Sequence, residues 1–129
     1  MEKRDLEELL ALEKKLYVRL TDTMSLTKEL GEAVERQDQA SVRLLLSQRQ
    51  KSVLELQELQ AYIGLKRCDL SGDDGERFDA LTAGLPALDA AERPVEAQVA
   101  LNRRLLEQLV ALDKRINLRL CGRRSCYGG

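Results

Sequence analysis

The sequence predicts an all-α protein: an elongated antiparallel three-helix bundle or coiled coil, with a short extra helix between the second and last long helices. Apolar residues recur at steps of three and four along most of the chain, which is the period of an amphipathic helix. Charged residues make up 33% of the chain and aromatic residues only 3%, as in long helices and coiled coils. The length of 129 residues predicts one domain, residues 1–122, followed by a flexible C-terminal tail, residues 123–129.

The first long helix is predicted to run from Asp5 to about Val34. Leucines recur along it about every 3.5 residues, and charged side chains fill the opposite face. Glycine in a helix interior costs about 1 kcal/mol relative to alanine. We therefore expect Gly31, near the end of the pattern, to be either an early stop or a point of close approach to another helix.

A polar stretch separates the first helix from the second, and it offers Asp38 and Ser41 as N-cap residues. The second helix is predicted to continue to Ile63 and to end at Gly64, because glycine readily adopts the positive φ of a helix C-terminus. Arg49 interrupts its apolar stripe. Such a short turn between two long amphipathic helices brings them back antiparallel.

The middle of the chain is predicted to hold an exposed loop and a short helix. Residues 65–75 are expected to be irregular, because Ser, Gly and Asp dominate the second half of the stretch. The short helix that follows is expected to end near Ala83. The last long helix is expected to begin at Pro86 and either to bend at Pro94 or to start anew there. A bend is favoured, because residues 89–93 form helices readily and offer little turn chemistry.

The last helix carries a heptad-like seam in which the steps alternate between four and three residues. The seam comprises Val95, Val99, Asn102, Leu106, Leu109, Asp113, Ile116 and Leu120. Asn102 and Asp113 are polar, and a buried polar residue in such a seam can fix register and partner choice. Alternatively, the apolar face is rotated, which would leave both polar residues at a solvated edge. That rotated face comprises Leu101, Leu105, Leu112 and Ile116. Gly122 is the predicted C-cap.

Composition narrows the classes of function. The formal net charge is −1 and tryptophan is absent, so we expect no binding of nucleic acid. The chain shows no secretory signal and no run of about 20 apolar residues, which predicts a cytoplasmic protein without membrane insertion. The three cysteines, Cys68, Cys121 and Cys126, are expected to be reduced thiols.

Chemistry at a catalytic or metal centre is not expected. The chain has no histidine, no glycine-rich phosphate loop and no nucleophile elbow. Its carboxylates are interleaved with Lys and Arg, as on solvated helix faces. We therefore expect no enzymatic activity, no catalytic residues, no cofactor and no metal site.

Three features resemble the FlgN-type flagellar export chaperones. These are the pair Leu9–Leu10 in the first helix, a polar turn at Asp38 that leads into Leu44–Leu45–Leu46 and a Gln/Lys-rich helix, and Leu101–Asn102–Arg103–Arg104–Leu105–Leu106 in a last helix followed by Tyr127 and Gly. The resemblance spans most of the chain and implies a cytosolic, non-enzymatic chaperone. Such a chaperone binds the C-terminal amphipathic helix of hook-filament junction proteins, prevents their premature assembly and delivers them to the flagellar type III export gate.

The resemblance also implies which residues contact partners. The floor of a client groove would comprise Leu105, Leu109, Leu112, Ile116 and Leu120, and Tyr127 would be the candidate contact with the export gate. Within the last helix, Val95, Val99, Leu106 and Leu109 are expected to pack against the first two helices. The row that ends at Ile116 and Leu120 is expected to be open to a partner. The same leucines could instead be ordinary core of a closed bundle. The competing function is a structural, oligomerising coiled-coil module without an export client, and a homo-oligomer is possible on either reading.

Overall fold

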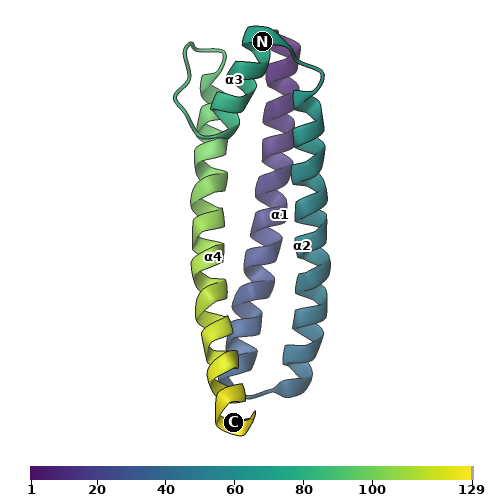
Figure 1. The fold of residues 1–129 in the computed structure, drawn as a ribbon, viewed down its shortest axis with the longest axis vertical. Coiled ribbons are helices and arrows are strands. Elements are labelled where there is room, and N and C mark those ends of the chain that lie inside the picture. Colours follow the sequence, from purple (N-terminus) through teal and green to yellow (C-terminus); the bar gives the residue numbers. More distant parts are fainter. Residues whose placement is uncertain (129) are drawn as a thin grey trace.

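The computed structural model describes the backbone of residues 1–128 and the side chains of residues 1–121. That part of the chain forms four α-helices and no strand (Figure 1): α1 (Lys3–Glu35), α2 (Gln39–Arg67), α3 (Gly72–Thr82) and α4 (Arg93–Gly128). The predicted all-α class is confirmed. So is the presence of a short helix between the second and last long helices.

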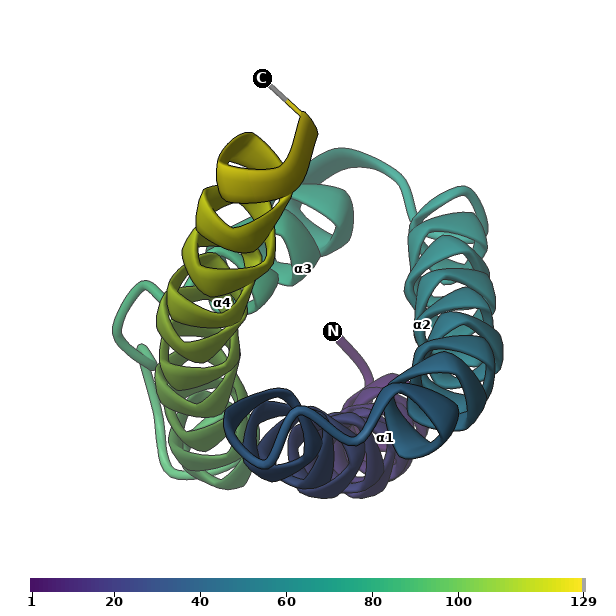
Figure 2. The ribbon, with the colours of Figure 1, turned by 90° about the horizontal axis from the view of Figure 1, so that it is seen from below.

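Helix α1 lies at the centre of the molecule and packs against both α2 and α4. Helix α2 runs antiparallel to α1, and α4 runs parallel to α1 on its other side (Figure 1). Seen along the long axis, α2 and α4 flank α1 and stand apart from each other (Figure 2). No described Cα atom of α2 lies within 8 Å of a Cα atom of α4, so these two helices do not pack directly. Helix α3 lies at the end that holds the N-terminus, where it contacts α2 and α4.

Local hydrogen bonds form the turn between α1 and α2. The Asp38 N–H bonds to the Ala33 carbonyl at 3.0 Å while Gln37 takes a φ of 58°, which is a Schellman-type helix end. Asp38 then caps α2, since its carboxylate accepts from the Ser41 hydroxyl at 2.7 Å and from the Ser41 N–H at 3.2 Å. These hydrogen bonds hold the pKa of Asp38 below its ordinary value. Of the two predicted caps, Asp38 is the one that the structure uses.

Two predicted boundaries in the middle of the chain are wrong. Helix α2 does not end at Gly64 but continues to Arg67. No neighbouring atom lies close to Gly64, so packing does not require a glycine there. Its only cost to stability is the conformational freedom that a glycine loses in a helix. The predicted loop over residues 65–75 is also too long, because α3 begins at Gly72. Asp73 and Asp74 occupy the first turn of α3, where carboxylates favour the positive end of the helix.

The end of α3 matches the sequence prediction. Ala83 is the C-cap, and Gly84 adopts a φ of 89° directly after it. The Leu85 N–H then bonds to the Ala80 carbonyl at 2.9 Å. A residue in this left-handed conformation is usually glycine, because a Cβ atom would be strained there.

Both ends of α4 differ from prediction. Helix α4 starts at Arg93, so the expected start at Pro86 and the favoured bend at Pro94 are wrong. Pro94 lies in the first turn, where its missing N–H and fixed φ cost nothing. At the other end, the backbone of α4 continues through Gly122 to Gly128, so the predicted C-cap at Gly122 is also wrong.

A buried carboxylate joins α3 to the start of α4. Glu92 accepts hydrogen bonds from Arg77 at 2.6 and 3.0 Å and from the Leu88 N–H at 3.0 Å. The Arg77 guanidinium, more than the other neighbours, holds the pKa of Glu92 below its ordinary value. The Glu92 N–H in turn bonds to Asp89 at 3.0 Å. Asp89 thus supplies a turn contact in a stretch whose other residues form helices readily, which explains why the segment before Arg93 is not helical.

The core lies between α1 and its neighbours and consists of two apolar clusters. Its larger part comprises Leu6, Leu9, Leu12, Leu16, Leu20 and Met24 of α1, Leu56 and Ile63 of α2, Phe78 and Leu81 of α3, and Val95, Val99 and Leu109 of α4. A smaller cluster near the α1–α2 turn comprises Leu30, Val34 and Ile116. Gly31 belongs to this second region, because a Cβ atom there would lie 3.2 Å from Cδ1 of Ile116. Gly31 is therefore a point of close approach, the second of the two predicted possibilities.

Candidate helix-binding surface

The inward face of α4 contains a buried polar contact. Asn102 is 3% exposed, and its Nδ2 donates to Oε2 of Glu13 at 2.7 Å and to the Glu13 carbonyl at 2.8 Å. Its Oδ1 accepts from Gln98 at 3.2 Å. The amide is thus satisfied on both sides, as a buried polar group requires. Asn102 of α4 can make this contact only when it lies level with Glu13 of α1, so the contact fixes the register of α4 against α1.

The surroundings of Glu13 favour its neutral form. Burial raises the pKa of the Glu13 carboxyl above its ordinary value, and the hydrogen bond from Asn102 partly opposes that rise. The alternative rotated face of α4 is wrong, since Leu101 is 46% exposed while Asn102 is buried. The seam that includes the polar residues is the face that packs.

The second polar seam residue, Asp113, bridges two helices that do not otherwise pack. Its Oδ1 lies 2.8 Å from Nη2 of Arg49 on α2, and both side chains are partly buried. Nε of Arg49 also donates to the Thr27 hydroxyl of α1 at 3.0 Å. Among the described side chains, Arg49–Asp113 is the one ion pair or hydrogen bond that joins α2 to α4. One turn away, the hydroxyls of Thr23 and Ser52 share a hydrogen bond at 2.7 Å.

Apolar side chains line both helices on either side of this ion pair. Because residues three and four apart share a helix face, the contact between Arg49 and Asp113 identifies the faces that α2 and α4 turn toward each other. We call these two faces the α2/α4 seam: Val42, Leu46, Arg49 and Val53 on α2, and Leu106, Val110, Asp113 and Leu120 on α4. Leu46 is 40% exposed and Val110 is 45% exposed. The α2/α4 seam is therefore an apolar strip with one charged pair at its centre.

The floor of the α2/α4 seam is already covered. Leu20, Thr23 and Thr27 of α1, which lie beneath it, are fully buried. A ligand at the α2/α4 seam would thus contact the rims on α2 and α4 and would leave α1 untouched. The rim residues Leu46 and Val110 were missed by sequence reasoning. The signal that could have found them is the interruption of two apolar stripes by the oppositely charged Arg49 and Asp113.

The residues predicted to contact partners do not form one surface. Leu109 and Ile116 are buried in the core. Leu109 thus packs as one of its two expected roles required and does not line a groove, and the expectation of an open row is wrong at Ile116. Leu105, Leu112 and Leu120 are half-buried. Leu120 and Val42 each pack against the smaller core cluster, at the end of the α2/α4 seam, whereas Leu105 and Leu112 lie on the side of α4 that borders the outer surface of α1. The Tyr127 side chain lies outside the described residues.

A shallow cleft accompanies Leu112 on that outer side. It has a volume of about 270 Å³ and lies between α1 and α4, where it is lined by Lys28, Gly31, Glu32, Glu35, Leu112, Arg115, Ile116 and Arg119. Arg119 pairs with Glu35 across it, and this contact lowers the pKa of Glu35. Five of the eight lining residues are charged and exposed, so the cleft is mainly a charged surface.

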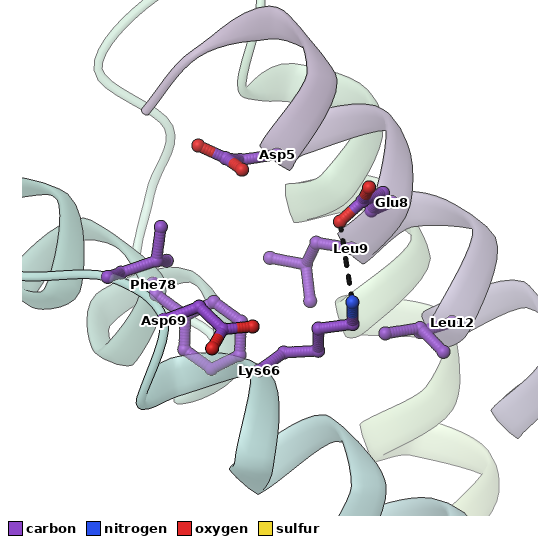
Figure 3. Close-up of a pocket in the computed structure, with 8 residues that line it drawn as sticks. Asp5, Glu8, Leu9, Leu12, Lys66, Asp69 and Phe78 are labelled. Carbon is purple, nitrogen blue, oxygen red and sulfur yellow. Dashed lines mark ion pairs between the residues drawn. The ribbon is translucent and has the colours of Figure 1, made fainter.

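A small pocket lies where α1, α3 and the end of α2 meet (Figure 3). Asp5, Glu8, Leu9, Lys66 and Phe78 are among its lining residues, and Nζ of Lys66 lies 3.7 Å from Oε2 of Glu8. The volume is about 40 Å³, which holds a few water molecules at the roughly 10–15 Å³ that each one needs. This pocket is too small for an organic substrate.

The described residues offer neither a metal site nor a membrane-spanning helix. No group of three or more potential ligand residues among those described could hold a metal ion, and none of the described helices is both long and apolar enough to cross a membrane. Cys68 and Cys121 are exposed free thiols.

Comparisons with protein-family models, with curated proteins and with solved structures find no significant match, so they add no relative from which a role could be transferred.

Proposed function

We propose that the protein is a cytosolic helix-binding chaperone of the FlgN type. In this proposal it binds the C-terminal amphipathic helix of hook-filament junction proteins and delivers them to the flagellar type III export gate. One observation carries the proposal: α2 and α4 flank α1 without packing on each other, and both turn apolar side chains toward the α2/α4 seam. The resemblance in the first and last helices supplies the identity of the client.

The α2/α4 seam suits a helix better than it suits an extended peptide or a small molecule. An amphipathic helix binds a groove between two helices through residues spaced three and four apart. Such a client would rest on Leu46 and Val53 on one side and on Val110 on the other, as the fourth member of a helical bundle. Extended peptides instead add to a free sheet edge, and the described part of the chain contains no strand.

The ion pair at the centre gives the α2/α4 seam its selectivity. A client that covers Arg49 and Asp113 removes water from both charges, so each must keep a partner. We expect a client helix to place a polar or charged residue at its midpoint and apolar residues on both sides. A client that is apolar at that point would bind more weakly.

The C-terminal end of α4 is assigned to the export gate. Tyr127 matches the terminal tyrosine of the family, and it lies beyond the α2/α4 seam on the same helix. A client in the α2/α4 seam and a gate contact at Tyr127 would therefore occupy separate parts of α4. Replacing Tyr127 by Ala should leave client binding unchanged and should reduce export.

The decisive experiment is a calorimetric titration with a synthetic C-terminal peptide of a hook-filament junction protein. We compare the wild type with Val110→Asp, in the α2/α4 seam, and with Leu101→Asp. Leu101 lies on the same helix and has nearly the same exposed fraction, 46% against 45% for Val110, but it lies on the outer side of α4, away from the α2/α4 seam. Val110→Asp should weaken binding by about tenfold or more, which is about 1.4 kcal/mol, and Leu101→Asp should not.

Circular dichroism must show that both variants keep the helicity of the wild type. Weakening by Leu101→Asp alone would move the client to the outer side of α4, beside Leu105 and Leu112. No binding of the peptide to the wild type would overturn the proposed function and favour the oligomerising module.

A further inference from the structure

Helix α2 has apolar side chains on two faces, and the fold uses only one of them. The inward face buries Ser52, Leu56 and Ile63. The outward face carries Leu44, Leu54, Tyr62 and Leu65, which are between 49% and 65% exposed. No described part of the chain covers this side of α2 (Figure 2). A helix that is apolar on both faces is normally buried on both faces.

The outward residues follow the spacing of a helix–helix seam. From Leu44 the steps of three and four lead through Ser47, Lys51, Leu54, Glu58 and Ala61 to Leu65, and Tyr62 flanks the row. We call this row the outer stripe of α2. It extends for about 31 Å at about 1.5 Å per residue, which is long enough to pack against another helix over several turns.

The outer stripe is complementary to itself when it is reversed. A two-fold axis between residues 54 and 55 places Leu44 of one copy opposite Leu65 of the other. The same axis places Lys51 opposite Glu58, twice, and brings the two Leu54 side chains together at the centre. A parallel pairing would instead set Lys51 against Lys51 and Glu58 against Glu58, which is unfavourable.

We propose that the outer stripe pairs with the outer stripe of a second copy of this chain, as an antiparallel two-fold dimer. The two charges of the stripe support this occupant, because Lys51 and Glu58 are both exposed and neither belongs to an ion pair among the described side chains. In the dimer each finds a partner within the contact, on either side of the central Leu54 pair. The same contact buries Leu44, Leu54 and Leu65.

This dimer is compatible with a helix bound at the α2/α4 seam. Leu54 lies about 140° around the helix from Arg49, at about 100° per residue. The outer stripe and the α2/α4 seam therefore lie on different sides of α2, and neither contact covers the other. The dimer does not depend on the proposed client, and its failure would leave the client proposal standing.

Charge exchange between two variants tests the proposal. Lys51→Glu and Glu58→Lys should each raise the dimer dissociation constant by about tenfold or more, as measured by sedimentation velocity, because each places like charges opposite each other twice. An equimolar mixture of the two variants should recover the wild-type affinity as a heterodimer. Lys114→Glu, an exposed lysine of α4, is the control and should leave the dimer unchanged.

Leu54→Asp provides a second test at the centre of the stripe. It should abolish the dimer, keep the helicity of the wild type and leave binding of the client peptide unchanged. A wild-type protein that stays monomeric at all concentrations would overturn the proposal. So would single charge variants that dimerise as well as the wild type, or a mixture that fails to recover association.

Discussion

Helices α2 and α4 both pack on α1, but they use their apolar residues differently. Helix α4 buries Val95, Val99, Leu109 and Ile116 on one face, and its two polar seam residues each find a partner. Helix α2 buries only Ser52, Leu56 and Ile63, and its other apolar residues surround the helix. The difference identifies α4 as the helix that fixes the fold. Helix α2 leaves more of its apolar residues exposed, on its side of the α2/α4 seam and along the outer stripe.

The largest expected effect separates a buried leucine of α4 from an exposed leucine of α2. Leu109→Ala should lower the free energy of unfolding by about 2–5 kcal/mol, because it removes core contacts and leaves a cavity. Leu54→Ala should change it by less than about 0.5 kcal/mol in dilute protein. Urea unfolding followed by circular dichroism measures both. Equal losses for the two variants would contradict the contrast between α2 and α4.

The next effect concerns the register contact of α4. Asn102→Leu should cost about 1–3 kcal/mol, since it leaves Oε2 of Glu13 without its hydrogen-bond donor in a buried site. Gln108→Leu, at an exposed position of the same helix away from the α2/α4 seam, is the control and should be nearly neutral. Adding Glu13→Leu to Asn102→Leu should recover much of the loss, because the buried carboxyl that lost its donor is then removed. A double variant less stable than Asn102→Leu would argue against the contact.

The smallest expected effect is a dependence on pH. Burial raises the pKa of Glu13, so the folded state binds this proton more tightly than the unfolded state does. The contribution of Glu13 to stability is therefore greatest below the ordinary pKa of 4.5 and is lost as the pH rises through the raised value. Glu13→Gln keeps an acceptor for Asn102 without the ionisable proton, so it should be more stable than the wild type at neutral pH.

The stability gap between Glu13→Gln and the wild type should shrink as the pH falls toward 4.5. The carboxylates of Asp38 and Glu92 have lowered pKa values, and their contributions are lost on acidification in both proteins, so they cancel in the comparison. Chemical unfolding across a pH series measures the gap. A gap that stays constant with pH would show that Glu13 does not titrate differently in the two states.

The sequence predicted the features that repeat with the helical period, and it missed the specific contacts between side chains of different helices. The steps along α4 narrowed its packed face to two alternatives, one of which includes Asn102 and Asp113, because a buried face repeats with the helix. Their partners Glu13 and Arg49 could not be read in the same way, since the Asn102–Glu13 contact joins residues 89 positions apart and needs the register of two helices. The apolar residues of α2 surround that helix, so no single face of it could be chosen from the sequence.

The boundaries that failed share a physical reason. Gly64 was interpreted by its most common role, as a helix end, and Pro94 was interpreted as a bend because residues 89–93 form helices readily. Glycine is also tolerated inside an exposed helix, and proline also begins one. The choice depends on neighbours, such as the capping contact between Asp89 and the Glu92 N–H.

Hydrogen exchange of the backbone amides tests the contrast between α2 and α4 most directly, because exchange follows local opening and α2 buries only Ser52, Leu56 and Ile63. In dilute protein without peptide, α2 should be the least protected of the three long helices. On addition of the client peptide, the amides around Arg49 should gain more protection than those of α3. The account is contradicted if α4 exchanges faster than α2 in the free protein, or if the peptide protects neither side of the α2/α4 seam.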